Sequence, residues 1–203
     1  MSNLGRKKQP ELVRAQLLTA AAEEAVAKGL GAVTLEAVAK RAGVSKGGLL
    51  HHFPNRQVLM EGMYQSVLDR FGAKIESLMA DDPDPAGRFS RAYLLATTVE
   101  ADDDLDNRIM AVASLAMSVE STLAGLWRDW LDEKLKQSGE DIQSVTGHLV
   151  RLATDGLWLE DCQSGTWVEP GSRQAIIDRL ITLSYEIEPA TSGGNTGGKK
   201  DER

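Results

Sequence analysis

Apolar positions in the first eighty residues recur every three or four places, which is the spacing of one face of an α-helix. Residues that cap or end helices separate the repeats. Thr34, Ser45 and Asn55 can each cap the N-terminus of the helix that follows. Gly29 and Gly43 stand where helices commonly end. The pattern predicts four helices, over residues 11–28, 35–42, 45–52 and 56 to about 79.

The same periodicity continues to residue 188, interrupted by acidic, Pro-containing or Gly-containing breaks. From Ile142 to Leu159 the apolar residues alternate in steps of three and four, which is typical of helices that meet along a seam. No segment shows the sustained alternation of a strand. The expected fold is therefore all-α with about nine helices, and the last five cover residues 86–100, 107–119, 123–137, 142–162 and 172–187.

The composition is that of an ordinary globular chain, with 203 residues of which 42% are hydrophobic. No unbroken apolar run approaches the length of a membrane span, and the N-terminus lacks the apolar stretch of a signal peptide. A single cysteine excludes an internal disulfide. We therefore expect a cytoplasmic protein without a membrane partner.

Charge is distributed unevenly along the chain. The total of −7 argues against a nucleic-acid partner, yet residues 1–56 carry nine Lys and Arg against four Asp and Glu, a net +5. The remaining residues carry 14 basic against 26 acidic side chains, a net −12. A basic quarter joined to an acidic remainder indicates a nucleic-acid-binding module attached to a second unit.

The helices predicted over 35–42 and 45–52 have the spacing of a helix-turn-helix. Ala39 is small enough to leave room where the helices cross, and Gly43 permits a left-handed backbone in the turn. The second helix of such a unit lies in the major groove of DNA, with its first residues facing the base edges. In this chain those residues are 46–48, so Lys46 is the expected reader of a base or phosphate.

The segment from Thr34 to Leu59, TLEAVAKRAGVSKGGLLHHFPNRQVL, resembles the DNA-binding signature of the TetR (tetracycline-repressor-like) family of bacterial regulators. The resemblance is detailed over the N-terminal quarter, and the other helices resemble the family in number, length and arrangement. It implies a dimeric regulator, usually a repressor. The C-terminal domain of such a regulator binds a small molecule and thereby releases a palindromic operator.

The resemblance also implies roles for single residues. Thr34 would contact a phosphate through its hydroxyl and backbone N–H, and His52 and Arg56 would contact phosphates as well. Leu50 stands where the family commonly has Tyr, so it can offer only an apolar contact, for instance to a thymine methyl. Arg56 stands where the family commonly has Lys. For Lys46 and Arg56 the alternative is an ordinary solvated charge. The predicted DNA-binding residues are Thr34, Ser45, Lys46, Gly47, Gly48, Leu50, His51, His52 and Arg56.

These observations divide the chain into three parts. Residues 1–56 form the expected N-terminal helix-turn-helix domain, and residues 57–188 the C-terminal effector-binding and dimerisation domain. Residues 189–203 are rich in Ser, Gly, Asn, Thr and Lys, which predicts a disordered tail. The last two helices carry more apolar surface than one core contact needs, so we expect a homodimer built as a four-helix bundle around a two-fold axis. The alternative is that both stripes lie in the core of one chain.

A ligand pocket in a helical domain needs apolar and aromatic walls with a few polar groups. Met adapts to variable shapes and Trp attracts cations, so the expected effector is small and apolar or aromatic, either neutral or cationic. Each aromatic residue taken alone is explained more simply by core packing. The predicted lining residues are Phe89, Tyr93, Met110, Met117, Glu120, Trp127, Trp130 and Trp158, with Glu100 and Asp155 as further polar candidates.

Two other classes of function compete with this interpretation. One is a regulator that binds DNA constitutively, or activates transcription, without an effector. The other is a helical enzyme, because His148, Asp155 and Cys162 are spaced by seven and fall on nearly one helix face. A lone His and a lone thiol are more often packing or surface residues. We therefore expect no enzymatic activity, no cofactor and no bound metal.

Overall fold

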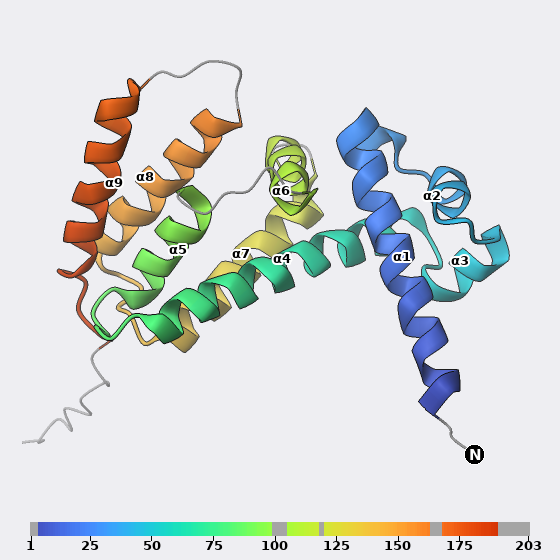
Figure 1. Ribbon diagram of the computed structural model, residues 1–203, viewed down its shortest axis with the longest axis horizontal. Coiled ribbons are helices and arrows are strands. Elements are labelled where there is room, and N and C mark those ends of the chain that lie inside the picture. The colour runs from blue at the N-terminus through green and yellow to red at the C-terminus, as the bar shows by residue number, and fades with distance from the viewer. Residues whose placement is uncertain (1–3, 99–104, 118–119, 163–167, 191–203) are drawn as a thin grey trace, which may run out of the picture.

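The structure is a computed structural model that describes residues 4–98, 105–117, 120–162 and 168–190, with side chains from residue 10 onward. The described residues form α-helices and one short 3-10 helix, which confirms the predicted all-α class (Figure 1). The elements are α1 (Leu4–Lys28), η1 (Leu30–Ala32), α2 (Leu35–Ala42), α3 (Lys46–His52), α4 (Arg56–Asp81), α5 (Arg88–Thr98), α6 (Leu105–Ala116), α7 (Ser121–Ser138), α8 (Val145–Asp161) and α9 (Pro170–Ser184).

Side-chain caps explain where α2, α3 and α4 begin. Thr34, Ser45 and Asn55 each accept a hydrogen bond from the backbone N–H three residues further on, at 3.1, 3.1 and 2.9 Å. Gly43 ends α2 in the left-handed conformation, with φ 67°. The predicted caps and the predicted extents of α2 and α3 are therefore confirmed.

Other predicted boundaries were wrong, and the largest differences are in α1, α8 and α9. Helix α1 begins at Leu4 instead of residue 11, because Pro10 removes a single N–H donor and does not stop the helix. Helix α8 begins at Val145 instead of residue 142, because Ser144 caps it. Helix α9 begins at Pro170, a residue favoured in the first helical position, and ends at Ser184 instead of residue 187. The predicted ends at 100 and 119 lie outside the described residues.

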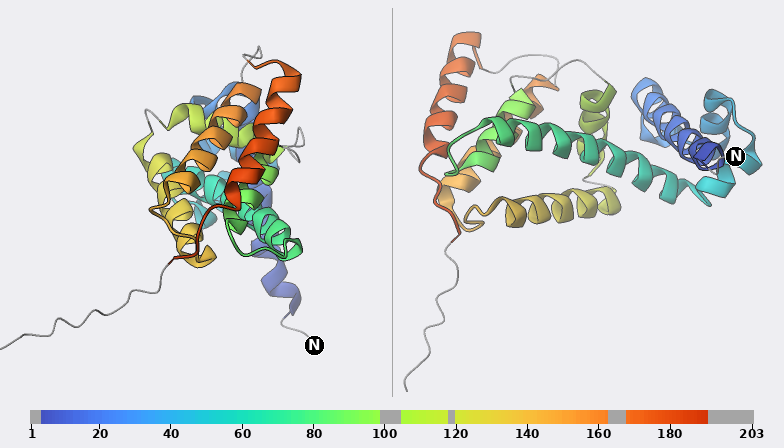
Figure 2. Two further views of the ribbon diagram at one scale, coloured as in Figure 1. Left: turned by 90° about the vertical axis from the view of Figure 1, so that its left-hand side faces the viewer. Right: turned by 60° about the horizontal axis from the view of Figure 1, so that its bottom comes forward.

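The elements form two units joined by one long helix (Figures 1 and 2). We call α1, η1, α2 and α3 the headpiece, and α5 to α9 the body. Helix α4 has 26 residues and runs from the headpiece along the body, a length of about 39 Å at the usual rise per residue. Helices α5, α8 and α9 lie side by side at the end remote from the headpiece, while α6 lies next to α1.

The apolar core is continuous between headpiece and body. One buried cluster includes Leu49 and Phe53 of the headpiece together with Leu59, Met63 and Tyr64 of α4, and extends through α5, α6 and α7. A second cluster joins α5, α8 and α9. The core thus crosses the proposed boundary between residues 56 and 57, and the division into two domains stays a prediction.

The C-terminal segment is pinned to the loop before α8. Glu140 and Pro189 form an isolated β-bridge, and the Ala190 N–H donates to the Gly139 carbonyl at 2.7 Å. The first two residues of the predicted disordered tail are therefore ordered, because their backbone finds hydrogen-bond partners on the body. Residues 191–203 of that tail lie outside the described residues.

In the part of the chain that the structure describes, no single helix has the length and apolarity to cross a membrane. Helices α6 and α7 have that length and apolarity only when they are taken together, and the angle between them is 118°.

Candidate functional site

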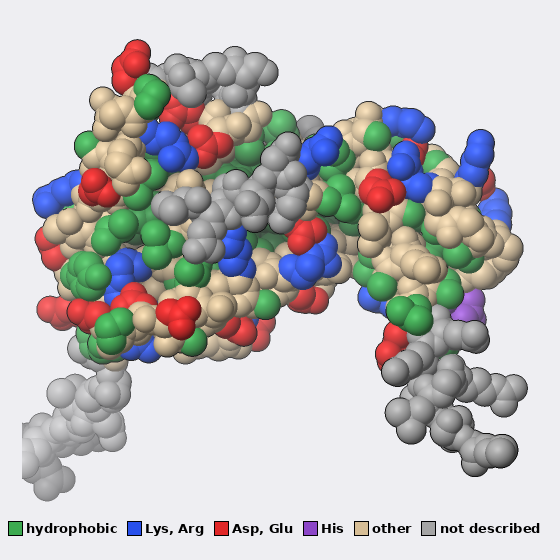
Figure 3. Space-filling view, in the orientation of Figure 1, with side chains coloured by type: hydrophobic (Ala, Val, Ile, Leu, Met, Phe, Trp, Pro, Cys, Tyr) green, Lys and Arg blue, Asp and Glu red, His purple; other side chains and the backbone are tan. Residues whose placement is uncertain are grey.

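The first candidate site is the surface where the N-termini of α2 and α3 meet. Lys46, the first residue of α3, is exposed, and its ammonium forms an ion pair with Glu36 in the first turn of α2. Figure 3 shows Lys and Arg side chains gathered on the headpiece around α2. Of the residues predicted to contact DNA, Thr34, Ser45, Lys46, Gly47, Leu50 and His51 are exposed, and Gly48, His52 and Arg56 are half-buried.

The two adjacent glycines of α3 differ in their surroundings. A Cβ added to Gly48 would lie 2.9 Å from Cγ1 of Val44, whereas one added to Gly47 would meet nothing within 4 Å. Gly48 is therefore required by the close packing of α3 on the turn before it. Gly47 leaves an open position beside Lys46.

Arg56 has a structural role that the sequence did not reveal. Its Nε donates to the Val33 carbonyl at 2.7 Å, and its Nη2 donates to the Leu30 carbonyl at 2.8 Å. These bonds hold η1 and the segment before α2 against the start of α4. Contact of Arg56 with a phosphate stays a prediction, and any such contact would have to coexist with these two bonds or replace them.

A second ion-pair group holds α1 to α2. Arg41 lies 2.7 Å and Lys28 lies 2.6 Å from the carboxylate of Glu24, which is 3% exposed. Hydrogen bonds from Lys28 and then Arg41 hold the pKa of Glu24 below its usual value. These two cations of the headpiece therefore serve its internal packing.

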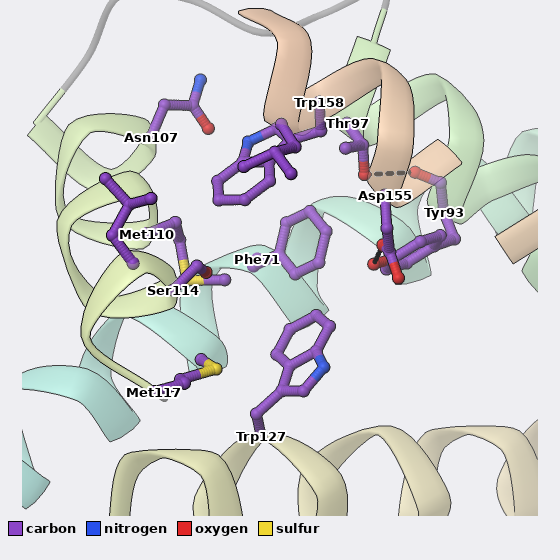
Figure 4. Close-up of a pocket in the computed structure, with 12 residues that line it drawn as sticks. Phe71, Tyr93, Thr97, Asn107, Met110, Ser114, Met117, Trp127, Asp155 and Trp158 are labelled. Atoms are coloured by element: carbon purple, nitrogen blue, oxygen red, sulfur yellow. Dashed lines mark hydrogen bonds between the residues drawn. The ribbon is translucent and has the colours of Figure 1, made fainter. Parts of the chain in front are cut away.

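The second candidate site is a cavity of about 300 Å³ in the body, bordered by α4, α5, α6, α7 and α8 (Figure 4). This volume lies at the lower end of the range of small-molecule pockets. The rings of Phe71, Trp127 and Trp158 face the space, and α6 supplies the opposite wall (Figure 4). The lining residues are Phe71, Tyr93, Thr97, Asn107, Met110, Ser114, Leu115, Met117, Trp127, Asp155, Trp158 and Leu159.

The cavity has one acidic group and, within the described lining, no basic one. The hydroxyl of Tyr93 donates a hydrogen bond to Oδ1 of Asp155 (Figure 4). Burial raises the pKa of Asp155, while the bond from Tyr93 and the charge of Arg151 act in the opposite direction. Burial, and next the charge of Asp155, raise the pKa of Tyr93 well above its usual value. The site therefore offers a partly desolvated carboxylate among aromatic rings.

Five of the eight predicted lining residues border this cavity: Tyr93, Met110, Met117, Trp127 and Trp158. The prediction was wrong for Phe89 and Trp130, which pack behind the wall, stacked on Tyr93 and Trp127 at ring-centroid distances of 6.2 and 5.2 Å. It was also wrong for Glu120, which precedes α7 and borders a separate depression beside Arg56. Asp155 lines the cavity, and Glu100 lies outside the described residues.

Six lining residues were missed. Asn107 and Ser114 lie three positions before and four positions after Met110, so helical spacing alone could have found them. Phe71 lies on α4, and nothing in the sequence distinguishes its ring from those of core residues. The remaining missed residues are Thr97, Leu115 and Leu159.

The structure does not assemble the residues considered for an enzyme. Nδ1 of His148 lies 2.8 Å from the Ser144 carbonyl, and Asp155 pairs with Tyr93. Cys162 follows the end of α8, and burial raises the pKa of its thiol. Residues seven apart on a helix are separated by about 10 Å along its axis, so His148, Asp155 and Cys162 cannot form a hydrogen-bonded nucleophile and base.

The middle of the seam predicted over Ile142 to Leu159 faces outward from the body, whereas Ile142 packs against the core and Leu159 borders the cavity. Val145, Leu149 and Leu152 are 74%, 56% and 67% exposed. Gly156, the next residue of the seam, is exposed and has nothing near its missing Cβ. In contrast, Ile177 of α9 is buried in the core of this chain. An exposed apolar stripe of this kind marks a surface for association.

Two family models match the chain. Residues 17–63 match the one described as bacterial regulatory proteins, tetR family, and residues 87–185 match the one described as tetracyclin repressor-like, C-terminal domain. The HTH-type transcriptional repressor KstR2 of Rhodococcus jostii (strain RHA1) is 29% identical over 120 residues. That match covers 59% of this chain and 56% of KstR2, so the chain spans only a little over half of that relative's length.

Solved structures share the fold. A transcriptional regulator from Rhodococcus sp. Rha1 has a TM-score of 0.67 and 23% identity, covering 88% of this chain and 96% of the regulator. The multidrug binding protein EbrR, complexed with malachite green, has a TM-score of 0.63 and 19% identity, covering 84% of this chain and 96% of EbrR. The two family matches cover the headpiece and the body in the expected order. The chain belongs to the TetR family of bacterial transcriptional regulators.

Proposed function

We propose that this TetR-family regulator is a ligand-responsive repressor that acts in the cytoplasm. A homodimer would bind a palindromic operator through α3, and a small effector in the body cavity would lower its affinity for that operator. The observation that carries this proposal is the shared position of α6, which lines the cavity and also lies against α1 of the headpiece. The named repressor KstR2 supports the direction of regulation.

A series of contacts connects the cavity with the headpiece and supports this proposal. Met110 and Ser114 of α6 border the cavity. At the start of α6, both carboxylate oxygens of Asp106 accept hydrogen bonds from Arg70 of α4. Arg56 then holds the first turn of α4 to the backbone of the headpiece. A ligand that favours a different position of α6 therefore changes the orientation of α3, to the extent that it binds the two arrangements unequally.

Dimerisation would use the exposed stripe of α8. Two recognition helices must lie about 34–36 Å apart to enter successive major grooves, and a two-fold axis provides that spacing. A stripe formed by Val145, Leu149 and Leu152 is self-complementary across such an axis. A change in the position of α4 in each chain would alter the distance between the two headpieces.

The lining of the cavity favours a flat aromatic effector, and the lone carboxylate favours one that carries positive charge. Rings of Trp and Phe attract cations, and a partly buried carboxylate gains from an opposite charge nearby. Asp155 would supply that charge, with Tyr93 holding it in place. Malachite green, an aromatic cation that EbrR binds, is therefore a suitable first probe.

The test begins with selection of sequences from a pool of random duplexes by the full-length protein. The expected result is a palindrome whose two halves are separated by about one helical turn. Malachite green should then release the selected duplex, and Asp155→Asn should weaken that release without changing DNA affinity in the absence of the dye. Enrichment of no sequence would contradict DNA recognition. Unchanged operator binding with every aromatic compound tried would instead favour a constitutive regulator.

A further inference from the structure

Five of the nine cations in residues 1–56 already have a partner within the described part of this segment or at the start of α4. Lys28 and Arg41 pair with Glu24, Arg56 donates to two backbone carbonyls, and the guanidinium of Arg14 lies over the Phe53 ring. Lys46 pairs with Glu36. The net charge of +5 thus describes a positive field, yet these five of the cations that create it already make contacts within the chain.

The pair between Lys46 and Glu36 differs from the others in its location. It joins the N-terminal turns of the two helices of the helix-turn-helix, and both side chains are well exposed, at 59% and 66%. The pairs of Glu24 lie instead where α1 meets α2, and the carboxylate of Glu24 is buried. The Lys46–Glu36 pair therefore lies on the surface predicted to face DNA.

Glu36 lies in the first turn of α2, two residues after Thr34, for which the family resemblance implies a phosphate contact. The N-terminal turn of a helix favours an anion, because its backbone N–H groups point outward and the helix dipole is positive there. The Lys46 ammonium, and next the residue's own backbone N–H, hold the pKa of the Glu36 carboxyl below its usual value. A carboxylate held in this way satisfies donors that a phosphate oxygen would also satisfy.

We propose that Glu36 is an internal competitor of the DNA backbone, and that its ion pair with Lys46 is broken when the protein binds DNA. This inference rests on the proposed DNA-binding function. It adds that the pair between Glu36 and Lys46 lowers the affinity of the protein for DNA. Lys46 exchanges a carboxylate of its own chain for a phosphate or base, so its net gain is small. Glu36, once released, faces the phosphates with a charge of the same sign.

The size of the effect follows from the exposure of the pair. Exposed ion pairs contribute little because water and salt screen them. We expect Glu36→Gln to tighten DNA binding by about two- to fivefold for each chain bound. Two chains bind in a dimer, so the combined gain is up to the square of this factor.

The test uses a fluorescein-labelled random-sequence duplex of about 30 base pairs and the full-length protein at low salt, about 50 mM NaCl, so that no operator needs to be known. Affinities are measured by fluorescence anisotropy for the wild type, Glu36→Gln and Lys46→Ala, and for the double variant. Glu23→Gln is the matched control, because it removes the same charge from the headpiece but lies on α1, 3.4 Å from Arg41. Thermal unfolding checks that each variant is folded.

The expected result is tighter binding by Glu36→Gln than by Glu23→Gln, and a smaller gain from Glu36→Gln once Lys46 is Ala. In the Lys46→Ala background, Glu36→Gln removes only the repulsion between Glu36 and phosphate. In the wild type it removes that repulsion and also the ion pair that competes for Lys46. Equal gains in the two backgrounds would overturn the proposal, as would weaker binding by Glu36→Gln, which would mean that Glu36 positions Lys46 for DNA. A wild type that binds no duplex would overturn the proposed function itself.

Discussion

Gly47 and Gly48 are neighbours on the recognition helix, yet replacing them with a larger residue should have opposite effects on stability. Glycine in a helix costs up to about 1 kcal/mol relative to alanine because it loses more backbone freedom on folding. At Gly47 nothing offsets that cost, since a Cβ would have open space. At Gly48 the close approach of Val44 makes glycine the residue that fits.

Gly48→Ala should therefore lower the free energy of unfolding by about 1–2 kcal/mol, because overpacking outweighs the gain in helix propensity. Gly47→Ala should raise it by about 0.5–1 kcal/mol. Urea unfolding monitored by circular dichroism measures both changes. Equal effects of the two substitutions would contradict the packing described for α3.

Asp155 gives the stability of the body a dependence on pH. Because burial holds its pKa above the usual value, folding favours the protonated acid. The stabilisation is fully present below the pKa of the unfolded chain and is lost as the pH rises through the folded pKa. Asp155→Asn should therefore gain stability relative to the wild type as the pH rises from about 4 to about 7. Urea unfolding over that range tests this, and a difference that stays constant with pH would contradict it.

At the scale of elements, the junction between headpiece and α4 depends on Arg56. Its two hydrogen bonds satisfy the carbonyls of Leu30 and Val33 near buried apolar residues. A purely electrostatic contact with DNA would not need these bonds. Measuring the free energy of unfolding without DNA therefore tests the structural role of Arg56 independently of its predicted contact with a phosphate.

Arg56→Ala should lower the free energy of unfolding by about 1–3 kcal/mol, because the Val33 carbonyl loses its side-chain donor and the Leu30 carbonyl keeps only the Val33 N–H. It should also weaken DNA binding to a similar extent for all sequences. Unfolding and anisotropy measurements on one preparation give both values, with Lys40→Ala as a control at an exposed cation of the headpiece. Full stability together with weak DNA binding would assign Arg56 to the phosphate alone.

Local signals in the sequence predicted the elements that local forces determine. The caps at Thr34 and Ser45 and the turn at Gly43 placed α2 and α3 correctly. The lining of the cavity was predicted only in part, because periodicity shows which face of a helix is apolar but not what covers it. Phe89 and Trp130 are buried in the core, where Trp130 packs on Phe71 of α4, whereas Trp127, three positions before Trp130, faces the open space.

On the scale of the whole molecule, the headpiece and the exposed stripe of α8 lie far apart along the structure (Figure 1). The stripe makes no contribution to the core of one chain, since Val145, Leu149 and Leu152 are mostly exposed. Association through this stripe would therefore control operator binding without touching DNA. Single chains would keep their fold but lose the paired recognition helices.

Leu149→Glu should convert the predicted dimer to monomers, because the carboxylate would be buried against its symmetry mate. Operator affinity should fall by at least tenfold, while the unfolding transition of the monomer stays cooperative. Light scattering coupled to size-exclusion chromatography gives the oligomeric state. A dimer that survives both this substitution and Leu152→Glu would place the interface elsewhere.

The position of α6 also has a consequence for how such a regulator can change by mutation. A single helix separates the cavity from α1, so a substitution at Met110 alters the shape of the ligand site and the support of the headpiece together. In the proposed repressor, background transcription without the effector and sensitivity to the effector should therefore shift jointly when α6 varies. Substitutions at Trp158, on the opposite wall, should change which compounds the cavity admits while the proposed repression without effector is kept.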